Sequence, residues 1–158
     1  MKKVFMIIAA LLITAGAMGQ NNYNSLYKKY SGKKDVSSVY ISPTMFKMMK
    51  SLPEIEISDD KDVRLDRIIR TFDGMYIVEV DNPSLASDLS KDVNALVSSG
   101  KLELLMEAIE KDETVRIYVE LKNNLVTEFV LLEQEYDSAT FISIVAEMPV
   151  DDLKRLIK

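Results

Sequence analysis

The sequence contains no cysteine, no histidine and no tryptophan, and it has only five glycines. Without cysteine no disulfide can form, so packing alone must stabilise the fold. The lack of histidine and cysteine excludes a Ser-His-Asp triad, a Cys-His pair and any zinc site built on those residues. No glycine-rich phosphate-binding motif is present. Catalysis would have to rely on carboxylates, Lys, Arg, Tyr, Ser or Thr, so we expect a protein that is not an enzyme and holds no cofactor.

Two local clusters resemble metal sites, but each has a simpler interpretation. The acidic run 58–62 is rich in aspartate, yet it lacks the central glycine and the closing glutamate of a calcium-binding loop. The methionines of segment 45–49 could bind copper(I) through their thioethers, but their spacing is also that of an apolar helix stripe. We therefore predict a solvated loop and a packed helix, and no metal site.

The charge balance also limits the partners. Acidic side chains outnumber basic ones by 25 to 20, and the formal net charge is −5. Nucleic acids and anionic membranes attract basic proteins, because both carry dense negative charge. We therefore expect no nucleic-acid partner.

Residues 1–19 have the three-part layout of a secretory signal peptide. Lys2 and Lys3 are followed by the apolar run 4–13 and then by small residues up to Gly19. An uncleaved membrane anchor would need about 20 apolar residues to cross a bilayer, and this run is shorter. Residues 20–158 are then expected to form a single α+β domain that is soluble in the periplasm or secreted, with no stable membrane insertion after cleavage.

Periodicity divides the rest of the chain into short elements. Helices are predicted where apolar residues recur at helical spacing, and strands where β-branched and aromatic residues cluster. The predicted helices cover 20–31, 43–52, 62–72, 85–99, 101–111 and 151–158. The predicted strands cover 36–41, 75–80 and three runs within 114–149 that short turns make antiparallel. The fold class is thus α+β, with a mainly antiparallel sheet of four or five strands and helices packed on one face in two layers.

The pair Asn123-Asn124 predicts a two-residue hairpin, since asparagine tolerates the positive φ of such turns. This turn sets Leu121 opposite Val126 and Val119 opposite Glu128. Continued along both strands, the register puts mainly aliphatic side chains on the face under the helices, with Ile142 and its alternate neighbours on the third strand. Glu128 is the exception there, and it would lie at a sheet end or pair with an arginine of segment 64–70.

The second face of the sheet is then unusually apolar. The same register places these residues on it: Tyr118, Phe129, Leu131, Phe141 and Val145. Exposed, they would form a patch of several hundred Å², more than ordinary monomers show. The N-terminal segment with its tyrosines, a second copy of the chain forming a homodimer, or another envelope protein or apolar ligand could cover it. We infer a partner or ligand surface, and hence a non-enzymatic protein-interaction module. The alternatives are a carrier of a small apolar ligand and a carboxylate-based hydrolase.

Three stretches resemble a known family. They are "GKLELLMEAIEKDETVRIYVELKNNLVTEFVLL", "VSSVYISPTMFKMM" and "FDGMYIVEVD". They are similar to the exported Bacteroidota domain-of-unknown-function family numbered 4252, and the resemblance covers about residues 24–157. The resemblance implies an exported domain with no assigned activity, and it carries no catalytic residues over to this chain.

Overall fold

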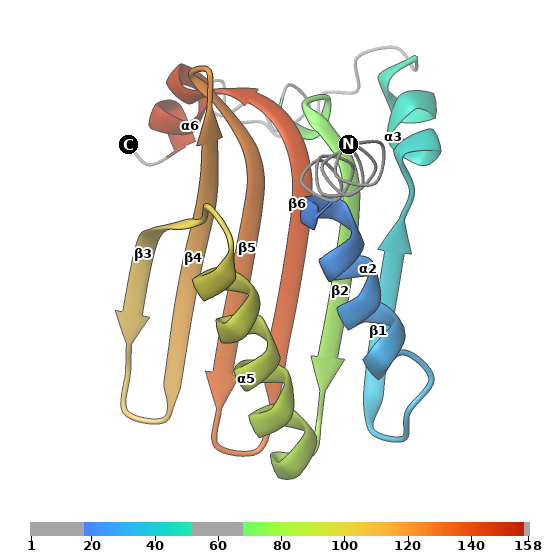
Figure 1. Cartoon of the computed structure of the whole chain (residues 1–158), viewed down its shortest axis with the longest axis vertical. Helices are drawn as coiled ribbons and strands as arrows, with labels where there is room; N and C mark the ends of the chain where they lie inside the picture. Colours follow the sequence, from blue (N-terminus) through green and yellow to red (C-terminus); the bar gives the residue numbers. More distant parts are fainter. Residues whose placement is uncertain (1–17, 52–67, 157–158) are drawn as a thin grey trace, which may run out of the picture.

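The computed structural model describes residues 18–51 and 68–156, which form one antiparallel sheet with four described helices around it (Figure 1). The spatial order of the strands is β1-β2-β6-β5-β4-β3. In chain order the described helices and strands are α2 (Met18–Tyr30), β1 (Val36–Ile41), α3 (Pro43–Lys50), β2 (Phe72–Val80), α5 (Pro83–Ser99), β3 (Glu103–Ile109), β4 (Glu113–Lys122), β5 (Leu125–Glu135), β6 (Ala139–Pro149) and α6 (Val150–Leu156). The α+β class and the antiparallel sheet are confirmed, but the sheet has six strands rather than four or five.

Two helices, α2 and α5, run along one face of the sheet, here called the helix face (Figure 1). They bury the larger of two apolar clusters, in which Tyr30, Leu89 and Phe141 are inaccessible to solvent. On the opposite face, here called the open face, α6 lies at one end, where Leu153 joins the smaller cluster with Met148. Ile68 and Phe72 pack against the same cluster, and Phe46 of α3 meets the Phe72 ring edge-on, with ring centroids 6.0 Å apart. The sequence predicted that the helices all pack on one face, and this prediction is wrong because α6 packs on the other face.

Local sequence signals set several helix ends as expected. Helix α2 ends at Tyr30, just before Gly32, whose φ of 79° favours glycine. Helix α3 begins after Ser42, whose side chain accepts a hydrogen bond from the Met45 backbone N–H at 3.3 Å. Helix α5 ends at Gly100 as predicted, but Asn82 caps its start. These ends depend on contacts within one turn, which explains why the sequence shows them.

The predicted helix 101–111 is wrong, because most of this segment forms the edge strand β3. Its residues are good helix formers, but β3 is antiparallel to β4 and satisfies the backbone hydrogen bonds of that strand's outer edge. A tight turn joins them, with the Glu110 N–H donating to the Glu113 carbonyl at 2.8 Å. Pairing with a neighbouring strand has overridden the local helix preference.

The hairpin after β4 confirms the turn but not the register. Asn123 and Asn124 have φ values of 52° and 61°, as a two-residue turn of this type requires. Leu121 does lie opposite Val126. A β-bulge then shifts the register before Glu128, so that Val119 lies opposite Phe129 rather than Glu128. The Thr127 hydroxyl at this bulge donates to the Glu120 carboxylate at 2.7 Å.

This one extra residue reverses the predicted faces of β4, and the pairing of Leu131 with Ile142 reverses those of β6. Tyr118 of β4 lies in the cluster under the helices, together with Val130 and Phe141, whereas Val119 packs in the cluster beside α6. On β6 the residues that alternate with Phe141, among them Ile142, lie on the open face rather than under the helices. A register shift by one residue moves every side chain of a strand to the other face.

Residues 1–17 of the predicted signal peptide, the acidic run 58–62 and most of the predicted helix 62–72 lie outside the described residues, while Met18 and Gly19 are the first residues of α2. The last residue of that predicted helix, Phe72, is the first residue of β2.

Candidate functional site

The open face carries an apolar row that crosses all six strands. Each member lies opposite the next in the strand registers, so the row is continuous across the sheet. The row consists of Val39, Ile77, Ile142, Leu131, Ile117 and Met106. Its two ends, on the edge strands β1 and β3, are each 47% exposed, and its inner members are half-buried.

A second apolar row lies beside the first, two residues further along the strands. It runs through Ile41, Met75, Ile144 and Phe129, all of them half-buried. Beyond Phe129 the row continues to Val119, which is only 3% exposed in the cluster that contains Leu153 of α6. We call the two rows, up to Phe129 in the second, the apolar band. Its exposed area is on the order of several hundred Å², at which a monomer surface usually has a function.

The ionisable side chains on this face are all acidic. On the six strands they are Glu79, Glu103, Glu113, Glu133 and Glu135. The carboxylates of the last three come within 4.8 Å of one another. Desolvation and repulsion from Glu133, Glu110 and Glu135 raise the pKa of Glu113. Glu79, Glu113, Glu133 and Glu135 therefore form an acidic row along one long side of the apolar band, whereas Glu103 lies opposite Val119.

The residues predicted as a partner or ligand surface are divided between the two faces. Phe129 and Leu131 lie in the apolar band. Tyr118 and Phe141 are instead 9% and 0% exposed under the helices, so their placement on one face with Phe129 is wrong. Val145 is also on the helix face, where it lines a small cavity.

The N-terminal segment covers part of the predicted apolar surface. The ring of Tyr23 in α2 stacks on that of Phe141, with ring centroids 6.0 Å apart. This contact corresponds to one of the three coverings that the sequence left open, in which the tyrosine-containing segment folds over Phe141. It leaves the apolar band on the other side of the sheet untouched.

Beneath α2 lies one partly buried carboxyl group. Glu128 faces the hydroxyl of Tyr23 and lies opposite Glu120 in the sheet. Burial raises the pKa of Glu128 to about 7, the repulsion from Glu120 adds to this, and the hydrogen bond from Tyr23 opposes it. Tyr23 is the described side chain that donates a hydrogen bond to Glu128, while Arg64 and Arg67, two of the arginines predicted as possible partners, lie outside the described residues. The hydrogen bond between Tyr23 and Glu128 helps to attach α2 to the sheet, and we interpret it as a structural contact.

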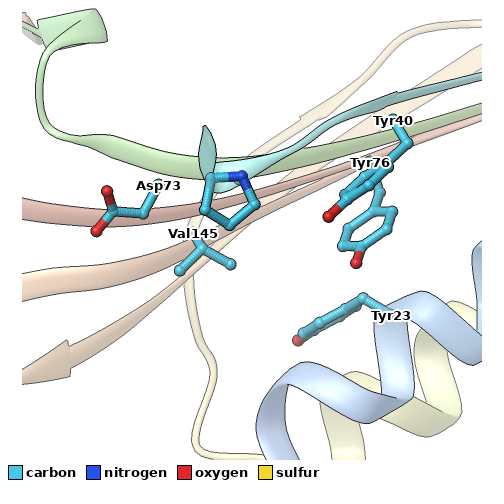
Figure 2. Close-up of a pocket in the computed structure, with 7 residues that line it drawn as sticks. Tyr23, Tyr40, Asp73, Tyr76 and Val145 are labelled. Carbon is cyan, nitrogen blue, oxygen red and sulfur yellow. The ribbon is translucent and has the colours of Figure 1, made fainter. Parts of the chain in front are cut away.

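The cavity next to this pair is small. Figure 2 shows Tyr23, Tyr40 and Tyr76 on one side of it, with Asp73 and Val145 on the other. The rings of Tyr40 and Tyr76 stack at 4.8 Å. The volume of the cavity is about 100 Å³, whereas pockets for drug-sized ligands measure about 300–1,000 Å³. The cavity between α2 and the sheet is therefore smaller than a pocket for a drug-sized ligand.

The second hollow lies at the turn end of the sheet, between the β3–β4 and β5–β6 turns. It measures about 330 Å³, and Glu110, Glu113 and Glu135 line it together with residues of both turns. It is the lower end of the acidic row described above. Carboxylates this close together attract cations.

Comparison with protein families shows to which family the chain belongs. A family model described as a domain of unknown function, DUF4252, matches residues 27–156. The chain belongs to this family. The match spans every described strand and confirms the resemblance seen in the sequence. No curated protein matches the chain.

Membership in DUF4252 assigns no activity, so the function has to be argued from the apolar band. Among the described residues no helix is long and apolar enough to cross a membrane. Sequence analysis missed most members of the band because it assigned Ile117 and Ile142 to the core. Glu128 does lie under the helices, as the sequence predicted, but opposite Glu120 rather than Val119.

Proposed function

We propose that the chain is an exported protein of the periplasm or extracellular space that acts as a non-enzymatic protein-interaction module. Its docking surface is the apolar band of the open face. The non-enzymatic part of the proposal rests on the residue types: the sequence offers no histidine or cysteine for catalysis. The export part rests on the signal-peptide layout of residues 1–19.

One observation carries the docking role. Two rows of aliphatic side chains remain half-buried, although α2 and α5 cover the other face completely enough to make Phe141 inaccessible. Removing about 400 Å² of such surface from water would contribute roughly 10 kcal/mol before the costs of association. A stable exported protein that exposes such a surface stands to gain this energy when a partner covers it.

The carrier alternative has less support from the same geometry. A carried apolar ligand needs an enclosed space, and the cavity beneath α2 measures only about 100 Å³. The apolar band is a broad sheet surface, which suits a protein partner better than a small molecule.

Native mass spectrometry of the chain purified from the periplasm tests the proposal, with two matched variants. Leu131→Asp places a charge in the middle of the apolar band. Ile109→Asp places the same charge on an apolar residue that is 68% exposed and lies outside the band. We expect a complex that survives Ile109→Asp and disappears with Leu131→Asp, while both variants keep the far-UV circular dichroism of the native chain.

Two other results would contradict the proposal. A complex that Leu131→Asp leaves intact would move the interface elsewhere on the molecule. A monomer that carries a few hundred extra daltons, about the mass of a drug-sized ligand, would instead favour the carrier.

A further inference from the structure

The open face also indicates what kind of partner it fits, an inference that rests on the proposed function. We infer that its occupant is a cationic amphipathic helix of another protein, with an apolar stripe on the band and Lys or Arg beside the acidic row. Three features of the open face support this partner: the shape of the apolar band, the sign of the charges along it and the position of α6.

The shape of the band suits a single helix. It crosses six strands, and the five spacings between them at about 4.8 Å make it roughly 24 Å long. At 1.5 Å per residue, about 16 helical residues span that length. Its two rows lie about 7 Å apart, so with side chains the band is as wide as one helix, which measures about 10–12 Å across.

The layer above the sheet is limited on both long sides. On one side, Leu153 of α6 packs on Val126 and Met148, so α6 already occupies this layer. On the other side the apolar residues give way to Glu79 and Glu133, which lie one position beyond Ile77 and Leu131 on the same face. A helix lying between them would contact α6 along one flank and carboxylates along the other.

The charges select the sign of the partner. Glu113, Glu133 and Glu135 crowd within 4.8 Å with no lysine or arginine on this face of the described strands. A basic side chain placed there would relieve their repulsion. A second copy of this chain would instead bring a second set of glutamates and a net charge of −5 to the interface. Like charges set against each other in this way oppose association, so self-association through this face is disfavoured.

A matched pair of synthetic peptides tests this inference by fluorescence anisotropy with the purified chain. Both are 16-residue amphipathic helices with the same leucine stripe, but one carries lysines and the other glutamates on its polar face. We expect the Leu/Lys peptide to bind at least tenfold more tightly than the Leu/Glu peptide, and this preference should shrink as salt is raised. Ile142→Asp should abolish binding, Glu133→Lys should weaken Leu/Lys binding severalfold, and Ile109→Asp should leave it unchanged.

The other outcomes separate this inference from the proposed function. If both peptides bind equally and Ile142→Asp abolishes both, the band is a docking surface but the cationic partner is wrong. If neither peptide binds, or if Leu/Lys binding survives Ile142→Asp, the inference that a cationic helix binds the apolar band is refuted. Loss of the native complex in Leu131→Asp would in those cases still support a docking surface for a partner of another shape.

Discussion

Glu128 makes the stability of this protein depend on pH in a direction opposite to that of a salt-bridged carboxylate. Burial under α2 raises its pKa from the ordinary 4.5 to about 7. Below pH 4.5 the group is protonated in both the folded and the unfolded chain and contributes nothing. Between 4.5 and 7 the unfolded chain releases the proton first, so unfolding becomes easier as the pH rises. Above 7 the full penalty of keeping a buried carboxylate applies.

The size of the effect follows from the two pKa values. Each pKa unit corresponds to about 1.4 kcal/mol, so the raised pKa lowers the free energy of unfolding by about 3 kcal/mol between pH 4.5 and pH 8. Glu128→Gln keeps the shape of the side chain and removes the titration. The variant should match the native chain near pH 4.5 and exceed its stability by about 3 kcal/mol at pH 8.

Urea denaturation from pH 4.5 to pH 8 measures this difference directly. Glu79→Gln, at an exposed position on the open face, controls for the loss of one negative charge. Tyr23→Phe gives a second check, because the hydrogen bond from Tyr23 lowers the pKa of Glu128. Without this hydrogen bond the pKa of Glu128 in the folded chain should rise further, so the loss of stability should continue to a higher pH. A stability difference between Glu128→Gln and the native chain that does not change with pH would refute the reasoning.

Three further predictions concern the core, the hairpin and the contact between the two long helices. Phe141→Ala should lower the free energy of unfolding by about 3–5 kcal/mol, and Ile142→Ala by clearly less, because only Phe141 is inaccessible under the helices; equal losses in urea denaturation would mean that the two faces are misassigned. Asn124→Val should cost about 1–2 kcal/mol while Asn124→Gly costs little, since φ at this position is 61°; thermal unfolding of the two variants gives the comparison. Asp92→Ala should cost about 1–3 kcal/mol, because the buried Tyr30 hydroxyl donates to its carboxylate at 2.7 Å; unchanged hydrogen exchange in α2 would contradict a role for this contact in holding the helix.

The same contact illustrates how a few polar groups hold α2 on the sheet. Burial alone would raise the pKa of Asp92, but the hydrogen bonds from Lys29 and Tyr30 lower it overall. Asp92 lies in α5, so this carboxylate joins the end of α2 to α5. Together with the stacking of Tyr23 on Phe141, it attaches α2 at its middle and at its C-terminal end.

The open face changes how the excess of apolar residues is understood. The sequence showed that the strands of 114–149 contain more apolar residues than one packed face needs. It placed the surplus on five residues of one face, of which Tyr118, Phe141 and Val145 in fact lie on the helix face and only Phe129 and Leu131 lie on the open face. The uncovered surplus is mainly isoleucine, leucine and methionine, and it extends over β1 and β2, which sequence analysis did not include in the surface.

The sequence by itself determined the features that depend on neighbouring residues. The absence of histidine and cysteine excluded whole classes of catalysis, Gly32 and Gly100 ended helices, and the positive φ of Asn123-Asn124 followed from the residue type. The α+β class followed from the periodicity of the apolar residues. All of these depend on interactions within a few residues, which the order of amino acids shows directly.

Only the tertiary structure decided the strand β3, the bulge at Thr127 and, with them, the identity of the open face. The segment 103–109 is helical by preference and becomes a strand because the outer edge of β4 needs a partner. The bulge places Val119 opposite Phe129 and exchanges the faces of β4, while the pairing of Leu131 with Ile142 fixes the faces of β6. Such choices are made by pairing between residues distant in the sequence, so no local pattern contains them.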